Sequence, residues 1–160
     1  MPQNALPLDI VVMAAGKGTR MKSKTPKVLQ KLAGRALLQH VLDTAAQLKA
    51  RSAVVITGHG AEAVEAAIAQ GRSAQALELK FVRQEPQLGT GHAVQQAVPA
   101  LADDGMVIVL SGDVPLTQAP TLHELVQAAD SRRMALLTVT LDNPTGYGRI
   151  VRNAQGTVQR

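Results

Sequence analysis

The 160-residue sequence contains no cysteine and no tryptophan, and it has only one phenylalanine and one tyrosine. Without cysteine the chain cannot use disulfide bridges, thiol catalysis or a cysteine zinc site. Single-stranded nucleic acids are bound by stacking bases on aromatic side chains, so the shortage of aromatic residues argues against that ligand. Hydrophobic residues still make up 46% of the chain. The core must therefore consist of Val, Leu, Ile and Ala, as in parallel sheets covered by helices.

Long apolar runs are also missing. No stretch approaches the roughly 20 residues that a membrane-spanning helix needs. The N-terminal sequence MPQNALPLD has neither a basic region nor a long apolar core, so it does not resemble a secretion signal. We therefore expect a cytoplasmic protein without a membrane partner. The length fits one domain, or part of a larger one, because domains usually have roughly 100–200 residues.

Acidic residues are absent from positions 10–42, which hold seven basic residues. The rest of the chain carries ten basic and twelve acidic residues, so the whole positive excess lies in this stretch. Nucleic-acid-binding surfaces usually spread their charge over a face or along a helix. Concentration in one stretch indicates a small polyanion instead, although a merely solvated charge run is the alternative. The basic residues are Lys17, Arg20, Lys22, Lys24, Lys27, Lys31 and Arg35.

Short apolar runs alternate with segments of helical periodicity. This alternation predicts an α/β protein, a Rossmann-like fold with a mostly parallel sheet and helices on both faces. In such folds ligands bind beyond the carboxyl ends of the strands. The last helix opens with a candidate capping box of Thr121 and Glu124. The expected strands cover 9–14, 53–58, 79–83, 106–113 and 134–141, and the expected helices cover 36–50, 61–70, 91–101 and 121–130.

The first strand runs into AAGKGTRM, a glycine loop in the basic stretch. Glycines let backbone N–H groups approach a phosphate closely, and a helix start would add a favourable dipole. The P-loop and dinucleotide fingerprints both fail, because Met21 stands where each requires a glycine. Arg20 and Lys27 flank the loop as phosphate ligands, and Pro26 stiffens the approach to Lys27. For the glycines alone, an ordinary strand-to-helix turn is the alternative.

The fourth expected strand ends in LSGDVPL, which places Asp113 at the mouth of the same crevice. A carboxylate there suits Mg²⁺, a hard cation that takes one or two carboxylates plus substrate phosphates. A helix cap or turn is the other interpretation of a lone Asp at a strand end.

Two further glycine-containing stretches follow expected strands. In QEPQLGTGHA, the glycines would let a flat ring lie on the backbone, and the Gln84 amide could pair with a base edge; a plain helix-start turn is the alternative. His92 reads better as a residue of the first helical turn than as a metal ligand. In DNPTGYGRI, Gly146 and Gly148 could shape a pocket wall.

Four stretches together resemble one family: AAGKGTRMKSKTPKVL, QLGTGHA, GDVPL and PTGYGRI. They are similar to the N-terminal uridyltransferase (pyrophosphorylase) domain of the bacterial bifunctional N-acetylglucosamine-1-phosphate uridyltransferase / glucosamine-1-phosphate acetyltransferase. The first stretch alone would indicate only the wider class of nucleotidyltransferases. The resemblance implies catalytic roles for Arg20, Lys27 and Asp113, with Asp113 also binding the metal. The implied substrate ligands are Met13, Ala14, Ala15, Gly16 and Lys27 at the nucleotide, Gln84, Gly89 and Thr90 at the uracil, Ser111 and Gly112 near the ribose and metal, and Gly148 at the sugar.

The implied reaction joins UTP and N-acetylglucosamine 1-phosphate into UDP-N-acetylglucosamine and pyrophosphate with Mg²⁺. The product would feed synthesis of cell-envelope precursors, peptidoglycan and lipopolysaccharide. We expect residues 1–160 to be the nucleotide-binding part of the domain. The second, sugar-binding half and a left-handed β-helix with acetyltransferase activity, through which the family forms homotrimers, are absent from the sequence. Another nucleotidyltransferase, or a fragment that only binds nucleotide, are the alternatives.

Overall fold

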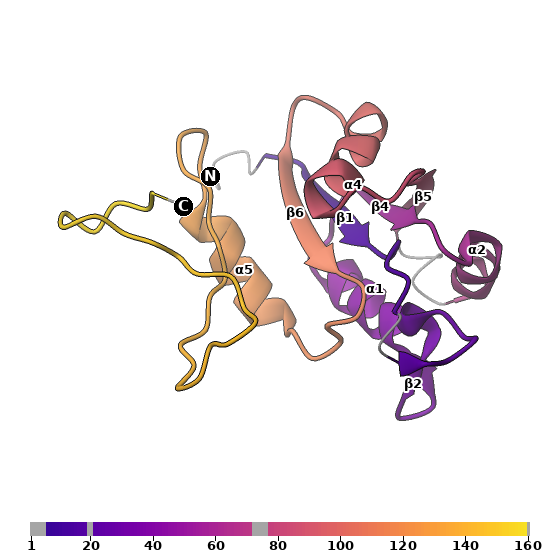
Figure 1. Ribbon diagram of the computed structural model, residues 1–160. Helices are drawn as coiled ribbons and strands as arrows, with labels where there is room; N and C mark the ends of the chain where they lie inside the picture. Colours follow the sequence, from indigo (N-terminus) through magenta and orange to yellow (C-terminus); the bar gives the residue numbers. More distant parts are fainter. Residues whose placement is uncertain (1–5, 19–20, 72–76, 160) are drawn as a thin grey trace.

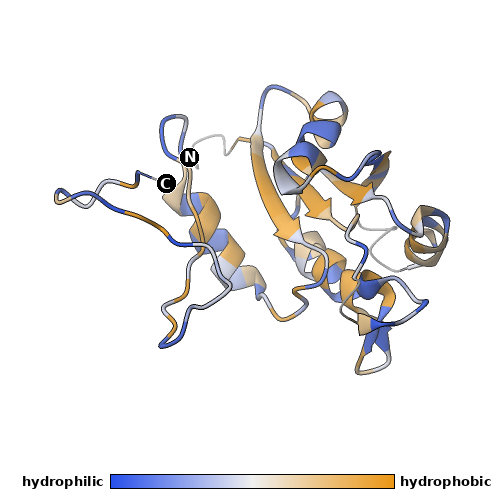
Figure 2. Ribbon diagram, in the orientation of Figure 1, coloured by the Kyte–Doolittle hydropathy of each residue, from blue (hydrophilic) through white to orange (hydrophobic). Residues whose placement is uncertain are grey.

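The computed structural model describes residues 6–18, 21–71 and 77–159. Four parallel strands form the central sheet in the order β5-β4-β1-β6 (Figure 1). They are β1 (Leu8–Met13), β4 (Ser52–Thr57), β5 (Glu78–Arg83) and β6 (Met106–Ser111). These strands confirm the first four strand predictions to within two residues at either end. The two central strands, β1 and β4, are rich in Val, Ile and Ala and are buried on both faces, as in parallel sheets covered by helices. The edge strands are less buried, and β5 interleaves charged residues with apolar ones. Figure 2 shows β1, β4 and β6 as largely hydrophobic ribbons.

Helices cover both faces of the sheet, as expected. One face carries α1 (Leu37–Gln47), α2 (Ala61–Ala69) and α5 (Ala119–Ala128), most of whose buried side chains belong to one apolar cluster. The opposite face carries α4 (Thr90–Ala97), which continues as the 3₁₀ helix η3 (Val98–Ala100). No helix within the described ranges is long and apolar enough to cross a membrane.

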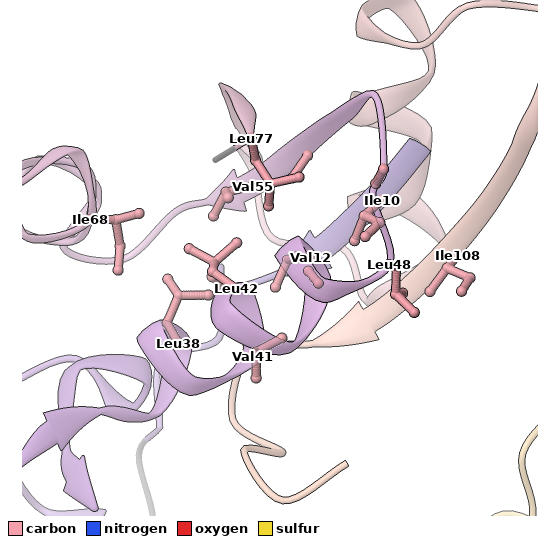
Figure 3. Packing of buried hydrophobic residues seen from close by; sticks show 14 of the residues in the cluster. Ile10, Val12, Leu38, Val41, Leu42, Leu48, Val55, Ile68, Leu77 and Ile108 are labelled. Atoms are coloured by element: carbon pink, nitrogen blue, oxygen red, sulfur yellow. The ribbon is translucent and has the colours of Figure 1, made fainter. Parts of the chain in front are cut away.

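The main core lies between α1 and the sheet. Leu38 and Leu42 of α1 are fully buried against Ile10 and Val12 of β1, whose side chains share one face of that strand (Figure 3). Val11 faces the other way and packs with Ala93 and Ala97 of α4. The alternation along β1 thus fixes the strand between two layers, and the chain that leaves its carboxyl end has little freedom of position.

The connection between β1 and α1 contains short elements that were not anticipated from the sequence. It contains the 3₁₀ helix η2 (Lys27–Leu29) and a hairpin of β2 (Lys31–Leu32) and β3 (Arg35–Ala36). Ala33 and Gly34 both have positive φ, as a two-residue hairpin turn requires. Val28 is buried in the main core, so η2 is anchored beside the sheet.

Two predictions about the C-terminal part are wrong. Residues 134–141 do not form a strand, and Met134 and Val139 are 89% and 74% exposed. Strand propensity is not enough without a neighbouring strand to satisfy the backbone. The capping box also fails, because α5 begins at Ala119 and no side chain caps it. Pro120 lies in the first turn, where its missing N–H costs nothing, so the helix starts before Thr121.

The outer edge of β6 has no paired strand among the residues described. On the α4 face, Val107 and Val109 are each 44% exposed, because α4 packs over β4, β1 and β5 instead. A cavity of about 700 Å³ separates β6 from α5 and residues 134–137. Residues 142–159 lie beyond α5 as seen from the sheet (Figure 1).

Candidate active site

The carboxyl ends of all four strands meet at one edge of the sheet, because all the strand pairs are parallel. The chain builds outward from β1 through β4 to β5 and then returns to place β6 on the other side of β1. The crevice between β1 and β6 is therefore the switch point at which open α/β sheets bind ligands. From the end of β5 to the end of β6 the edge spans three strand intervals, or about 14 Å.

The loop after β1 starts from a buried position beside β4. The backbone N–H of Ala14 donates to the Ile56 carbonyl at 2.9 Å, and Ala14 and Ala15 are almost fully buried. Gly16 and Lys17 then emerge exposed at the edge. The loop thus offers a rigid base and an accessible tip, as close approach by an anion requires. Thr19 and Arg20 lie outside the described residues, so the expected role of Arg20 rests on the sequence.

Packing of the residues before and after Lys27 places this lysine at the edge of the sheet. A Cβ added to Gly60 would come within 2.8 Å of the Pro26 ring, so Gly60 and Pro26 pack without room for a side chain. Val28 is buried in the main core. Because the residues before and after it are fixed, Lys27 projects from a defined position, as expected from the adjacent proline.

Lys27 and Asp113 form an ion pair across the crevice. Both side chains are about one third exposed, at 37% and 29%. Asp113 is placed by Gly112, whose N–H donates to the Met13 carbonyl at 2.9 Å and continues the pairing of β6 with β1. A Cβ at Gly112 would come within 3.1 Å of that carbonyl oxygen, so a larger residue would push the turn away. The structure therefore brings together two of the three catalytic candidates.

The donor set at this position suits a hard divalent cation. Within the described ranges no group of three or more His, Cys, Asp and Glu side chains could enclose a metal. Asp113 offers one partly exposed carboxylate, which matches a cation that completes its shell with phosphate oxygens and water. A metal held in this way would depend on the substrate phosphates. Ser111, the last residue of β6, lies beside this carboxylate in sequence.

The segment after β5 forms the opposite end of the edge. The backbone N–H of Gln84 donates to the Thr57 carbonyl at 2.8 Å, which extends the sheet by one residue. Its side chain is buried, and its Nε2 donates to the Gly89 carbonyl at 2.9 Å and lies 3.2 Å from His92 Nδ1. Gly89 itself has a φ of 98°, which only glycine adopts readily. Gly89 and Thr90 are exposed at the start of α4.

Gln87 links the β5 end of the edge to the loop after β1, and its role was not anticipated from the sequence. Its Nε2 donates to the Ala15 carbonyl at 3.0 Å, which joins the loop after β5 to the loop after β1. A Cβ at Gly58 would come within 2.6 Å of the same nitrogen. A cleft of about 420 Å³ opens here, lined by Lys17, Gly58, His59, Ala61, Glu62, Arg83, Gln84, Glu85, Pro86 and Gln87. It opens beside the Gln84 end of the edge.

A charged network fixes the end of β5 below this cleft. Arg83 forms ion pairs with Glu62 at 2.9 Å and Glu65 at 3.2 Å, both on α2. The hydrogen bond from Arg83 lowers the pKa of Glu65, and the Thr57 hydroxyl donates to the same carboxylate. Neither acid was singled out from the sequence, because the contact joins a helix to a strand that lies elsewhere in the chain. The network holds Gln84 through its neighbour Arg83.

Gly148 is the one described candidate that the structure does not bring to this edge. It lies in the exposed C-terminal segment, near a turn in which the Tyr147 N–H donates to the Pro144 carbonyl. The other described candidates end or follow β1, β5 and β6. The larger cavity between β6 and α5 is lined mainly by apolar residues, unlike a site for phosphates.

Comparison with solved structures shows the same fold in several other proteins. Rv0371c from Mycobacterium tuberculosis H37Rv matches with a TM-score of 0.63 and 24% identity over 79% of this chain and 62% of that one. A nucleotidyl transferase from Methanothermobacter matches with a TM-score of 0.61 and 22% identity, over 80% and 59%. A second structure of Rv0371c contains manganese.

The sequence relatives are much closer. Bifunctional protein GlmU from Acidovorax ebreus is 71% identical over 154 residues, which cover 96% of this chain and 32% of the relative. GlmU from Polaromonas sp. JS666 is 65% identical over 161 residues, with 97% and 34% covered. The chain thus spans about a third of the length of these curated relatives, and the similarity expected from the four motifs is confirmed. The model of the MobA-like NTP transferase domain matches residues 10–153. The chain belongs to the MobA-like NTP transferase domain family.

Proposed function

We propose that this chain carries the nucleotide-binding part of a uridyltransferase that makes UDP-N-acetylglucosamine and pyrophosphate from UTP and N-acetylglucosamine 1-phosphate. The observation that carries the proposal is the Lys27–Asp113 pair at the switch point, in a chain 71% identical to a GlmU protein. A cation and a carboxylate at this point match a ligand made of phosphates and a metal.

The nucleotide would lie along the strand ends. Met13, Ala14, Ala15 and Gly16 would line it, and Gln84, Gly89 and Thr90 would read the uracil at the β5 end. Ser111 and Gly112 would lie near the ribose. Contact of Gly148 with the sugar would require the exposed C-terminal segment to approach this edge. The strand order supports placing the uracil near β5 and the phosphates near β6, because Gln84 and Asp113 follow the two outermost strands of the four.

The reaction needs no protein nucleophile. An oxygen of the sugar phosphate attacks the α-phosphorus of UTP, the new P–O bond forms, and the bond to the β-phosphate breaks to release pyrophosphate. The attacking phosphate is already anionic, so no general base is required. Substrate binding would separate the ion pair, with the Lys27 ammonium on phosphate oxygens and the Asp113 carboxylate free to hold the metal. Arg20 would bind the leaving pyrophosphate.

We take the metal to be Mg²⁺, held by Asp113 and the substrate phosphates. When bound, it would neutralise the charge that develops on the phosphates. Lys27 contributes to the same end, since a preorganised cation beside a developing anion is worth about 10²–10³ in rate.

The relatives are about three times as long as this chain, which supports further parts in the complete protein. We propose that these are the sugar-binding half of the domain and a left-handed β-helix that transfers acetyl groups and forms a homotrimer. We also propose that the enzyme is cytoplasmic. Both additional parts are inferred from the resemblance and the relatives' length.

The test is pyrophosphate release by the full-length protein with N-acetylglucosamine 1-phosphate, Mg²⁺ and each of the four nucleoside triphosphates. UTP should support turnover far better than ATP, GTP or CTP. Asp113→Ala should reduce the rate by about 10²–10³, whereas Asp103→Ala, an exposed aspartate before β6, should leave it unchanged. Preference for another triphosphate would overturn the uridyl assignment, and normal turnover of Asp113→Ala would remove Asp113 from the mechanism.

A further inference from the structure

The amide of Gln84 is held in one orientation by its surroundings. Its Nε2 lies 2.9 Å from the Gly89 carbonyl oxygen, which can only accept a hydrogen bond. The amide nitrogen, and not the oxygen, must therefore face Gly89. Among the residues that the structure describes, the amide oxygen of Gln84 accepts no hydrogen bond. Every described side-chain N or O atom that is sealed from solvent has a partner, so this oxygen must be accessible to solvent. The oxygen of Gln84 is thus left available on a side chain that lines the cleft.

His92 supplies the second contact that fixes this amide. Its Nδ1 lies 3.2 Å from Gln84 Nε2, and its Nε2 lies 3.1 Å from the amide nitrogen of Gln96. A neutral imidazole has one hydrogen and so cannot accept at both ring nitrogens. Because Gly89 fixes the amide of Gln84, Nδ1 must be the acceptor and Nε2 must carry the hydrogen. A half-turn of the Gln96 amide, which exchanges two atoms of similar size, then lets its oxygen accept from Nε2. The half-turn gives up only the long contact, at 3.5 Å, between the Gln96 amide nitrogen and the His92 carbonyl.

We propose that His92 is a positioning residue for base recognition, which holds Gln84 so that its amide oxygen is presented to a base with an N–H donor on its pairing edge. This proposal rests on the uridyl transfer proposed above and adds the source of its base specificity. Uracil offers an N3–H donor to such an oxygen. Cytosine has a bare N3 acceptor at the same place, so its lone pair would face the oxygen without a hydrogen between them.

Discrimination between uracil and cytosine depends on the Gln84 amide being held in one orientation. A glutamine that can turn freely offers its oxygen to uracil or its NH₂ group to cytosine, and it favours neither strongly. With Nε2 held by Gly89 and His92, turning the amide would break two hydrogen bonds and place two oxygens against each other at Gly89. A site that cannot change its donor pattern rejects the mismatched base more strongly.

The experiment measures kcat/KM for UTP and CTP with the full-length protein, together with the dissociation constants of both nucleotides without sugar phosphate. His92→Leu removes the acceptor at Nδ1 and should lower the ratio of UTP to CTP preference by about tenfold, the worth of one net hydrogen bond. His92→Asn places an amide oxygen near the former Nδ1 and should restore most of that ratio. His123→Leu, at an exposed histidine of α5, is the matched control and should leave the ratio unchanged.

The outcomes separate the two proposals. If the wild-type protein does not make UDP-N-acetylglucosamine but still binds UTP better than CTP, the proposed reaction fails while the binding ratios continue to test His92. A wild-type protein that shows no preference between UTP and CTP overturns the role of His92. So does a His92→Leu variant that keeps the wild-type ratio, or a His92→Asn variant that loses as much as His92→Leu. Thermal unfolding of each variant shows whether it is folded, and the ratio compares two ligands on the same folded molecules.

Discussion

Removal of the Asp9 carboxylate should destabilise the fold by about 3 kcal/mol. Asp9 is 1% exposed in β1, at the end of the strand opposite the candidate site. Arg51 donates to both carboxylate oxygens, at 2.6 and 3.2 Å, and the Ser52 hydroxyl donates at 2.8 Å. These bonds join the start of β1 to the start of β4, and Asp104 holds the outer side of the same guanidinium at 2.9 Å.

The size of the expected loss in unfolding free energy depends on which interactions the partners of Asp9 keep after the substitution. Breaking a buried ion pair by removing one member costs about 3–5 kcal/mol. The lower end applies because Arg51 is 34% exposed and retains Asp104, so its charge is not stranded. For a domain of this size, about 3 kcal/mol lowers Tm by roughly 6–12 °C. Asp104 is 66% exposed, so Asp104→Ala should cost no more than about 1 kcal/mol.

Urea unfolding of the wild type, Asp9→Ala and Asp104→Ala checks this expectation. Equal losses for the two variants would refute the reasoning, since they would mean that burial of Asp9 adds nothing. The pH dependence provides a second check. The hydrogen bond from Arg51 lowers the pKa of Asp9 in the folded protein. Its stabilisation is therefore complete above the unfolded value near 3.9 and is lost as the pH falls through the lower folded pKa. The stability gap between wild type and Asp9→Asn should narrow over that acidic window.

Two further predictions concern the basic loop and are read from steady-state kinetics with UTP. Gly18→Ala should lower kcat/KM about tenfold, because Gly18 has a φ of 58° and the new methyl would lie 2.9 Å from Lys27 Cβ. Gly156→Ala is its control, because Gly156 also has a positive φ, of 80°, but an added Cβ meets nothing within 4 Å. Equal effects of the two variants would show that displacement of Lys27 is not the cause. Arg20→Ala should depress turnover far more than Lys22→Ala, and similar losses would mean that the loop acts only as a diffuse charge.

The sequence was sufficient for the sheet and for the edge that carries the site. Strand and helix periodicities alternate clearly, and parallel strands must end together. That rule alone predicts that the loop containing Lys27 and the turn containing Asp113 lie at the same edge of the sheet. Strand direction is enough to predict the shared edge. The ion pair also requires β6 to lie beside β1, and the order of the elements along the chain does not reveal that.

The parts that sequence could not supply are contacts between distant segments. Gln87 and Ala15 are 72 positions apart, and no local pattern pairs them. The Gln84–His92 contact is closer in sequence, but its meaning depends on where Gly89 points its carbonyl. Residues 134–141 show the opposite problem. Their sequence has a strand pattern, but a strand forms only beside another strand, and the local sequence does not show whether one is present.

The outer strand β6 also has a consequence for how the protein behaves in solution. Its sequence MVIVLS contains no charged residue and no proline, the features that natural edge strands use to prevent pairing with other chains. With Val107 and Val109 partly exposed and the outer backbone groups unpaired within the described ranges, β6 offers a template for a strand from another molecule. Aggregation of the concentrated chain would therefore begin at this edge, at the side of the sheet away from the Gln84 end of the site.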